Sequence, residues 1–205
     1  MSINGLLIAS GLSSRIDGFK PLLKYNGKTF LISIVEKMLT ELENVVIVVG
    51  YEHLLLLNEF ETHFNCTLQK LNSKCWQINS RITILLNEDY QNGMFTSLQL
   101  GVKQLRNSDW ILYHFVDQPT IPNEFYGELT KRVKADTNFI QPLFEGRKGH
   151  PVLFDKIVSS KIIKAKNSSN FREVLHDKTI EKYLWECKYP QVLEDIDTDE
   201  DYLKL

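Results

Sequence analysis

The stretch with the clearest chemical meaning is a loop of small and charged residues that follows a short apolar run near the N-terminus. Residues 6–9 are apolar, and residues 10–20 bring serines and glycines together with Arg15 and Lys20. A strand that ends in such a loop leaves backbone N–H groups unpaired, and these groups bind anions such as phosphate. Arg15 could grip phosphate oxygens bidentately, while Lys20 would add a point charge. The pattern predicts a phosphate-binding loop, although it matches neither common glycine-rich template, and the alternative is a glycine turn with two surface cations.

Carboxylates follow at two later points of the chain. Asp117 comes directly after the apolar run 110–116, at the predicted end of a strand. A carboxylate there, aimed at a phosphate loop, is a natural ligand for Mg²⁺, and the alternative is a helix cap or turn before Pro119. Asp195 and Asp197 begin an acidic run, for which the alternative is a solvated tail or a helix cap.

Two further segments carry polar groups in loops. Gly93, within residues 87–97, precedes a predicted helix whose first N–H groups are free to meet a base or a phosphate. A plain loop with an ordinary helix cap explains the same pattern. His150 lies between Gly149 and Pro151, which indicates a loop position, and a structural role for this histidine remains the alternative.

Composition narrows the class of protein. The chain has 205 residues, is 43% hydrophobic and carries a net charge of −2, which is typical of a globular protein and argues against a nucleic-acid surface. We expect a single domain over residues 1–205, with a local excursion at 65–80. No apolar run is long enough to cross a membrane and no signal-peptide pattern is present, so we expect a cytoplasmic protein. Its three cysteines are sparse and form no C-x-x-C pair, which favours reduced thiols over disulfides or zinc.

The elements that would position these residues alternate along the chain. Apolar runs predict strands at residues 3–8, 45–49, 81–86 and 110–116, with shorter strands at 139–140 and 152–154 and a possible late strand at 181–186. Periodic apolar stripes predict helices over 28–42, around 54–64, around 95–105 and from 120 onward, and Ser168-Ser169 could cap another. Alternation of this kind predicts an α/β fold with a mostly parallel sheet and helices on both faces. Ligands bind beyond the carboxyl ends of such strands, where the loop 10–20, residues 87–97 and Asp117 would meet.

With these segments in order, the chain resembles a known family. Residues 7–23 resemble the L-x-A-x-G-x-S-x-R-M-G-x-x-K-x-L-L signature of nucleotidyltransferases. Residues 87–97, 116–119, 146–151 and 195–201 resemble, in this order, further motifs of the branch that contains molybdenum cofactor cytidylyltransferase and its relatives. Together the five motifs cover the chain from about residue 5 to its end. The last two narrow the resemblance to this branch.

Membership would imply a fold, a reaction and a set of roles. The fold would be a Rossmann-like three-layer sandwich, similar to nucleotide-diphospho-sugar transferases. The reaction would be Mg²⁺-dependent transfer of a nucleotidyl group from a nucleoside triphosphate, with CTP favoured, to a phosphate-bearing acceptor such as molybdopterin, with release of pyrophosphate. Arg15 and Lys20 would hold the triphosphate, Asp117 would bind the metal, and Asp195 or Asp197 would complete the metal site. The resemblance places nucleotide binding at Ala9, Ser10, Gly11, Ser13, Gly93, Met94 and Ser97, and acceptor binding at Arg147 and His150.

Alternatives stay open at this point. Ser10 stands where the cytidylyl branch usually has alanine and the guanylyl branch glycine, so the base is not fixed. The acceptor could instead be a sugar or polyol phosphate. The second half of the chain builds the acceptor pocket, and its sequence pattern does not identify the acceptor. A different class of function is a non-catalytic accessory protein for molybdenum hydroxylase maturation, which would bind nucleotide and dock on a molybdenum enzyme. No nucleic-acid or membrane partner is expected.

Overall fold

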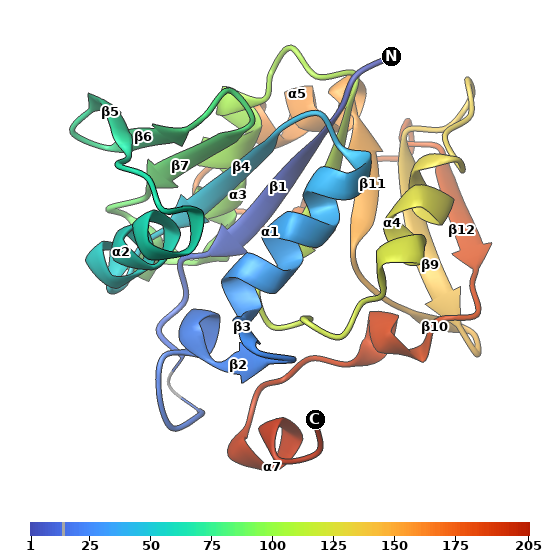
Figure 1. The fold of residues 1–205 in the computed structure, drawn as a ribbon. Helices are drawn as coiled ribbons and strands as arrows, with labels where there is room; N and C mark the ends of the chain where they lie inside the picture. Colours follow the sequence, from blue (N-terminus) through green and yellow to red (C-terminus); the bar gives the residue numbers. More distant parts are fainter. Residues whose placement is uncertain (14) are drawn as a thin grey trace.

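A large mixed β-sheet with helices on both faces forms the body of the molecule (Figure 1). The structure is a computed structural model that describes residues 1–13 and 15–205. Nine of the ten strands follow the order β10-β9-β11-β8-β1-β4-β7-β6-β5, and β12 pairs with β9. The predicted α/β class with a mostly parallel central sheet is confirmed.

Four parallel strands at the centre of the sheet carry the site. They are β8 (Trp110–Phe115), β1 (Ile3–Ala9), β4 (Val45–Val49) and β7 (Ile82–Leu86), each hydrogen-bonded to the next in that order. Their registers pair Ala9 with Val49, Val49 with Leu86, and Ile8 with Phe115. The carboxyl ends of all four strands therefore meet at one edge, and the loops that follow them lie there together.

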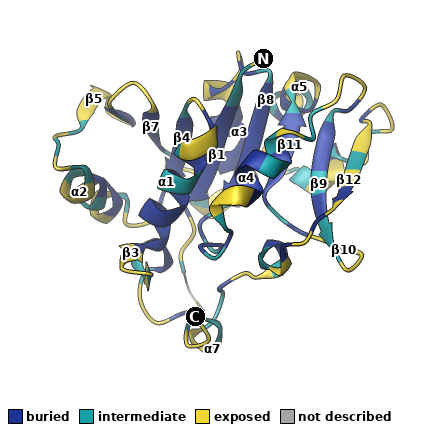
Figure 2. Ribbon diagram, turned by 45° about the vertical axis from the view of Figure 1, so that its right-hand side comes forward, coloured by how far each residue is buried: buried dark blue, intermediate teal, exposed yellow. Residues whose placement is uncertain are grey.

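Apolar side chains on both faces of these strands explain the two helical layers. Leu7 belongs to one core cluster, whereas Leu6 and Ile8 belong to the other, as the alternation of a strand requires. The first cluster is covered by α1 (Phe30–Glu41), α2 (His53–Phe64) and α4 (Asn123–Thr130), and the second by α3 (Met94–Gln104) and α5 (Lys156–Lys164). Figure 2 shows the central strands as the most deeply buried part of the fold.

Residues 65–80 contain a hairpin that the sequence pattern did not reveal. It consists of β5 (Gln69–Asn72) and β6 (Cys75–Ile78), and β6 extends the sheet by pairing antiparallel with β7. Every residue of β5 is exposed, so the strand has no buried face to produce an alternating pattern.

The second half of the chain departs further from the expectations. Strand β9 (Phe139–Phe144) is longer than predicted, β11 (Val152–Asp155) runs antiparallel to β8, and β12 (Lys182–Glu186) runs parallel to β9. Helix α5 was not predicted, and it follows its N-cap Asp155, whose carboxylate accepts from two N–H groups of the first turn. The cap predicted at Ser168-Ser169 is wrong, because Asn170 caps α6 (Phe171–Val174) through a capping box with Glu173.

The remaining elements are short. They are β2 (Lys24–Tyr25), β3 (Lys28–Thr29), β10 (Arg147–Lys148), α7 (Asp199–Tyr202) and 3₁₀ turns at Lys20–Leu22, Tyr90–Asn92 and Pro190–Leu193. Cys66, Cys75 and Cys187 are free thiols, as predicted. Within the described residues, no helix has both the length and the apolar character needed to cross a membrane.

Candidate active site

A cavity of about 310 Å³ opens at the carboxyl ends of β1 and β8. The loop after β1 forms one wall, the start of α3 a second, and the loop after β8 a third. Residues from the C-terminal segment close the remaining side. The lining residues are Ile8, Ser10–Ser13, Arg15, Lys20, Pro21, Tyr90, Met94, Phe115–Asp117 and Asp197.

The loop after β1 is anchored to α3 through its first polar side chain. The hydroxyls of Ser10 and Ser97 lie 2.8 Å apart, and Asn87 Nδ2 donates to Ser97 Oγ at 2.8 Å. All three side chains are buried. Ser10 therefore fixes where the loop lies, and a buried partner occupies its hydroxyl. Gly11 lines the cavity, and a Cβ built there would meet open space, so the glycine keeps the cavity floor free of a side chain.

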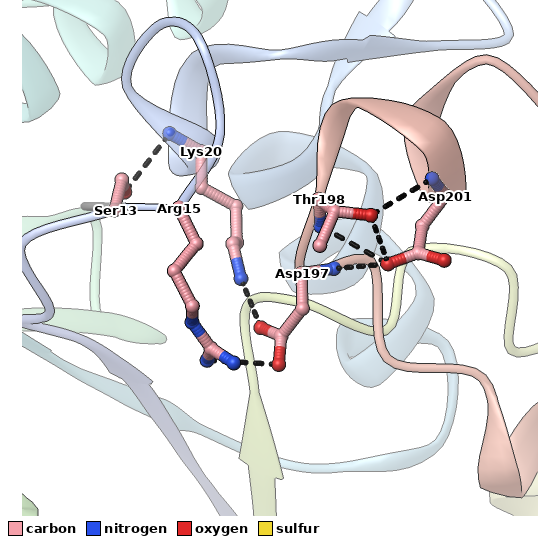
Figure 3. A network of polar contacts seen from close by, with 6 residues as sticks. All are labelled: Ser13, Arg15, Lys20, Asp197, Thr198 and Asp201. Atoms are coloured by element: carbon pink, nitrogen blue, oxygen red, sulfur yellow. Dashed lines mark hydrogen bonds and ion pairs between the residues drawn. The ribbon is translucent and has the colours of Figure 1, made fainter.

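Arg15 and Lys20 both point at one carboxylate, that of Asp197 (Figure 3). Lys20 Nζ lies 2.6 Å from Asp197 Oδ1, and an Arg15 guanidinium nitrogen lies 2.9 Å from Oδ2. The backbone N–H of Lys20 donates to Ser13 Oγ at 3.0 Å, which closes the loop on itself. In this structure a carboxylate occupies the position between the two cations, and a phosphate group carries the same charge sign and similar acceptor oxygens.

Asp197 is held in place by the cap of α7. The Asp201 carboxylate accepts from the N–H groups of Thr198 and Asp197, at 3.0 and 3.3 Å, and Thr198 Oγ1 accepts from the Asp201 N–H. The helix cap that was the alternative interpretation of this acidic run is thus present, and it positions a carboxylate of the cavity at the same time.

Asp117 lies at the end of β8, beside the same C-terminal segment. The Ile196 N–H donates to the Asp117 carbonyl at 2.8 Å, which fixes Asp195 and Asp197 next to Asp117. Burial, together with the charges of Asp195 and Asp197 and against the opposing charge of Lys20, raises the pKa of Asp117 to about 6. Burial and the charge of Asp197 also raise the pKa of Asp195. These carboxylates repel one another and gain from a shared cation.

The carboxylates fit a divalent metal, although they do not form a closed metal cage. Asp117 Oδ1 is buried and has no hydrogen-bond partner among the described residues, so it is free for a cation. Asp117 and Asp197 both line the cavity, whereas Asp195 does not. Across the part of the chain that the structure describes, no three His, Cys, Asp or Glu side chains are grouped so that they could hold a metal by themselves. Such an open site suits Mg²⁺, which usually keeps waters and takes further oxygens from substrate phosphates.

Lys37 supports this site from below, and no pattern in the sequence points to it. Its ammonium group donates to the carbonyls of Pro119 and Ile121, at 2.6 and 2.9 Å, and so holds the loop that follows Asp117. Burial lowers the pKa of Lys37 to about 8. In the sequence, a lysine within this helix has the pattern of an ordinary surface residue. The contact with the loop after Asp117 is therefore visible only in the fold.

Tyr90 is a second residue that the sequence analysis did not single out, although it lies within residues 87–97. It lines the cavity, and its Cβ approaches the end of β4 so closely that a Cβ on Gly50 would lie 2.8 Å away. Gly50 is thus required by this approach. Phe115 and Leu12 add apolar surface to the same cavity. An apolar and aromatic wall beside a cationic one suits a base next to its phosphates.

The other predicted nucleotide-binding residues differ in their distance from the cavity. Ser10, Gly11, Ser13 and Met94 line it, and Met94 is 54% exposed. Gly93, at φ 103°, forms the N-cap of α3 and lines an adjoining cavity. Ala9 lies within β1, and Ser97 lies fully buried beneath the loop, so both act on the shape of the site.

The two residues predicted for acceptor binding lie apart from each other. His150 lines two adjoining cavities, and its ring lies 4.9 Å from that of Phe115, which lines the main cavity. Arg147 is exposed in β10 and lines none of these three cavities, whereas its neighbour Lys148 lines one of them. The structure thus brings His150 toward the site and leaves Arg147 outside it.

Comparison with known proteins places the chain among nucleotidyltransferases. The family model of the MobA-like NTP transferase domain matches residues 5–182. The molybdenum cofactor cytidylyltransferase of Escherichia coli (strain K12) is 27% identical over 202 residues, which cover 98% of this chain and 94% of that protein. Nicotine blue oxidoreductase of Paenarthrobacter nicotinovorans is 25% identical over 212 residues, which cover 99% and 96%.

The fold comparison agrees with the family match. A solved nucleotidyl transferase from Methanothermobacter thermautotroptrophicus superposes with a TM-score of 0.77 at 18% identity, over 99% of this chain and 95% of that chain. The predicted nucleotide-diphospho-sugar transferase-like architecture is confirmed.

Proposed function

This chain belongs to the MobA-like NTP transferase family and is a nucleotidyltransferase, and from that premise we propose that it transfers a cytidylyl group from CTP to molybdopterin. One observation carries the proposal: a single cavity collects two cations, Arg15 and Lys20, and two carboxylates, Asp117 and Asp197. This is the charge pattern that a metal–triphosphate complex requires.

The reaction has a simple balance of bonds. An oxygen of the acceptor's phosphate attacks the α-phosphorus of the triphosphate, and a new phosphoanhydride bond forms. The bond between the α-phosphorus and the bridging oxygen breaks, and pyrophosphate leaves with that oxygen. The attacking phosphate is already an anion, so the chain needs no strong general base. Its task is to position two anions and to neutralise their charge.

Asp117 and Asp197 would hold the divalent cation, proposed to be Mg²⁺, and Asp195 would add negative charge beside them. The ion neutralises phosphate charge and polarises the α-phosphorus when it is bound. Members of this family typically depend on a divalent metal.

The two cations that pair with Asp197 would exchange this partner for phosphate when nucleotide binds. In the structure described above, Arg15 and Lys20 share the single carboxylate of Asp197. Phosphate oxygens would replace this carboxylate at the two cations, and Asp197 would then be free to face the metal. Before nucleotide binds, the ion pairs with Asp197 would reduce the unpaired positive charge in the cavity.

The proposal that the base is cytosine rests on the relatives and on the residues that line the cavity. Of the two relatives described above that align over almost the whole chain, one is named a molybdenum cofactor cytidylyltransferase and the other a nicotine blue oxidoreductase. The base would lie between the loop 10–13 and the side chains of Tyr90 and Met94. Docking of the protein on a molybdenum enzyme, which would receive the product, belongs to the same proposal.

Two assays test the proposal in sequence. Thermal shift with CTP, GTP, ATP and UTP, each with Mg²⁺, should show the largest stabilisation for CTP, because a ligand that binds the folded state stabilises it by mass action. Pyrophosphate release should then require CTP, Mg²⁺ and molybdopterin together. Release with a sugar or polyol phosphate in place of molybdopterin would replace the proposed acceptor. Absence of release with every triphosphate and acceptor would refute the proposal.

A further inference from the structure

Asn87 directly follows β7 and lies behind the active-site cavity. Its backbone N–H donates to the Val49 carbonyl at 2.8 Å, which ties the residue to the end of β4. Its side chain is buried, and within residues 1–13 and 15–205 it is not among those that line the cavity. A buried amide must find its hydrogen-bond partners inside the protein, so its contacts show what it holds in place.

The side-chain amide of Asn87 uses both of its N–H groups and its oxygen. Asn87 Nδ2 donates to Ser97 Oγ at 2.8 Å and to Thr96 Oγ1 at 2.9 Å. Asn87 Oδ1 accepts from the Asp89 N–H at 3.0 Å. One planar group thus joins α3 to the loop that follows β7.

Two of these partners lead on to separate walls of the cavity. The hydroxyl of Ser97 lies 2.8 Å from that of Ser10, in the loop after β1. Thr96 Oγ1 donates to the carbonyl of Gly93 at 2.8 Å, and Gly93 directly precedes Met94 at the start of α3. Ser10 and Met94 both line the cavity.

The third partner leads to the wall that contains Tyr90. Asp89 directly precedes the 3₁₀ turn Tyr90–Asn92, and its bond to Asn87 fixes where this turn begins. Tyr90 lines the cavity, opposite no direct contact with Asn87 that the structure describes. One side chain behind the cavity therefore connects three segments whose residues form its surface.

We propose that Asn87 is a positioning residue for the donor nucleotide, because its amide keeps the loop after β1, the start of α3 and the turn of Tyr90 at the spacing that a nucleotide requires. The inference rests on the proposed function, since it takes the ligand of this cavity to be a nucleoside triphosphate. Loss of the amide removes no charge and no metal ligand. It should weaken nucleotide binding by displacing residues that touch the ligand.

Asn4 offers a matched control at the opposite edge of the sheet. Its side chain is also buried, and its Nδ2 donates to Ser108 Oγ at 2.8 Å. Asn4 lies near the beginning of β1, whereas the cavity opens at the carboxyl ends of the strands. Asn4→Ala and Asn87→Ala should both lower the melting temperature, because each leaves a buried serine hydroxyl without its donor.

Calorimetric titration with CTP in the presence of Mg²⁺ compares these two variants. The Kd for CTP should rise at least tenfold in Asn87→Ala and should stay within twofold of wild type in Asn4→Ala. A purely structural role would change the Kd in both variants or in neither. A Kd within twofold of wild type in Asn87→Ala would overturn the inference.

The double variant T96V/S97A removes the same hydrogen bonds from the other side and keeps Asn87. It should raise the Kd for CTP by a similar factor, and combining it with Asn87→Ala should add less than threefold, because the contacts are already lost. Effects that multiply in the combined variant would overturn the inference. If Asn87→Ala does not fold, T96V/S97A carries the test alone, and a Kd within twofold of wild type would overturn the inference.

Labelling of the methionine methyl groups with ¹³C separates the inference from the proposed function, because it needs no ligand. Met94 lines the cavity, whereas Met38 Cε lies close to Gly5, the neighbour of Asn4. The Met94 NMR signal should shift in Asn87→Ala and stay unchanged in Asn4→Ala, where the Met38 signal should shift instead. If wild type binds no triphosphate, the proposed function fails, and a Met94 shift would still support the role of Asn87 in shaping the cavity. An unchanged Met94 signal in Asn87→Ala would overturn that role.

Discussion

The two halves of the molecule build their parts of the site by different means. In the first half, parallel strands deliver each polar loop to the same edge of the sheet, so the loop after β1 and the Asp117 loop meet by topology alone. In the second half, antiparallel strands, a short capped helix and a C-terminal segment bring residues together over long separations. The first half is proposed to bind the donor triphosphate, and the second half is proposed to bind the acceptor.

The difference explains where charge is balanced and where it is not. In the donor cavity Asp197 forms ion pairs with both Arg15 and Lys20. The cavity lined by Lys148, Arg172 and Lys182 has no carboxylate among its lining residues, as far as the structure describes the chain. A triphosphate with a metal is the same kind of ligand in every turnover, and a compensated site can exchange one set of ion pairs for another. A concave site lined by one sign of charge instead concentrates anions.

Asp117→Asn should have the largest effect on turnover. Asp117 lies at the end of β8, between the two halves of the molecule. The amide keeps the shape and removes the charge that would hold the metal, so we expect kcat to fall by about 10³-fold or more, as for the loss of a major electrostatic contact with a transferring phosphoryl group. Circular dichroism should show an unchanged fold. An active Asp117→Asn enzyme would remove the metal role of this residue.

Lys20→Ala should have the next largest effect, and it should separate donor binding from acceptor binding. We expect the KM for CTP to rise by about 10- to 100-fold, since a charge-assisted contact to phosphate is lost, while the acceptor KM changes little. The matched control is Lys28→Ala, which removes a lysine whose ion pair with Glu36 lies outside the cavity. If Lys20→Ala altered the acceptor KM more than the CTP KM, the assignment of this loop to the donor would fail.

The metal-free stability of the protein should depend on pH through Asp117. Its pKa is raised in the folded state from 3.8 to about 6, so between these values the folded state binds more protons than the unfolded state. The free energy of unfolding therefore falls as pH rises from about 4 to 6, and the loss persists above pH 6. Asp117→Asn lacks this penalty and should be more stable than wild type by about 3 kcal/mol at pH 8, with little difference at pH 4.

Urea denaturation in the presence of a chelator, at pH 4, 6 and 8, measures this difference. Addition of Mg²⁺ and CTP at pH 8 should then stabilise wild type and leave Asp117→Asn nearly unchanged. Equal stabilities of the two proteins at pH 8 would show that the buried carboxylate is not a source of strain in the empty site.

Ser10→Ala should have the smallest effect, and it tests whether the Ser10 side chain selects the base. The hydroxyl of Ser10 pairs with Ser97 in a buried network, so its loss should cost about 1 kcal/mol of stability. We expect the ratio of kcat/KM for CTP to that for GTP to change by less than about threefold, because the hydroxyl is engaged away from the base. A tenfold change in this ratio would assign base selection to the Ser10 side chain.

The sequence predicted the first half well because its signals are local. The β-branched run 45–49, the apolar run before Ser10 and the position of Asp117 after another apolar run each define a strand and the loop that follows. In a parallel sheet these loops share an edge, so the relation between the loop 10–20 and Asp117 followed without tertiary information.

The second half resisted prediction because its signals are not local. Helix α5 has the sequence KIVSSKIIK, whose β-branched residues and serines disfavour a helix until Asp155 caps it and the core buries Val158 and Ile162. The contacts of Lys37 with the loop after Asp117, and the meeting of Lys148, Arg172 and Lys182, depend on chain segments that only the fold brings together.

Detection of the product of nucleotidyl transfer tests the central claim most directly. Wild-type protein, α-labelled CTP, Mg²⁺ and molybdopterin should yield one labelled cytidylylated product for each pyrophosphate released, and Asp117→Asn should yield neither. Pyrophosphate without a labelled product would mean hydrolysis of CTP and would contradict transfer. A labelled product formed equally by wild type and Asp117→Asn would contradict the cavity at β1 and β8 as the site of the reaction.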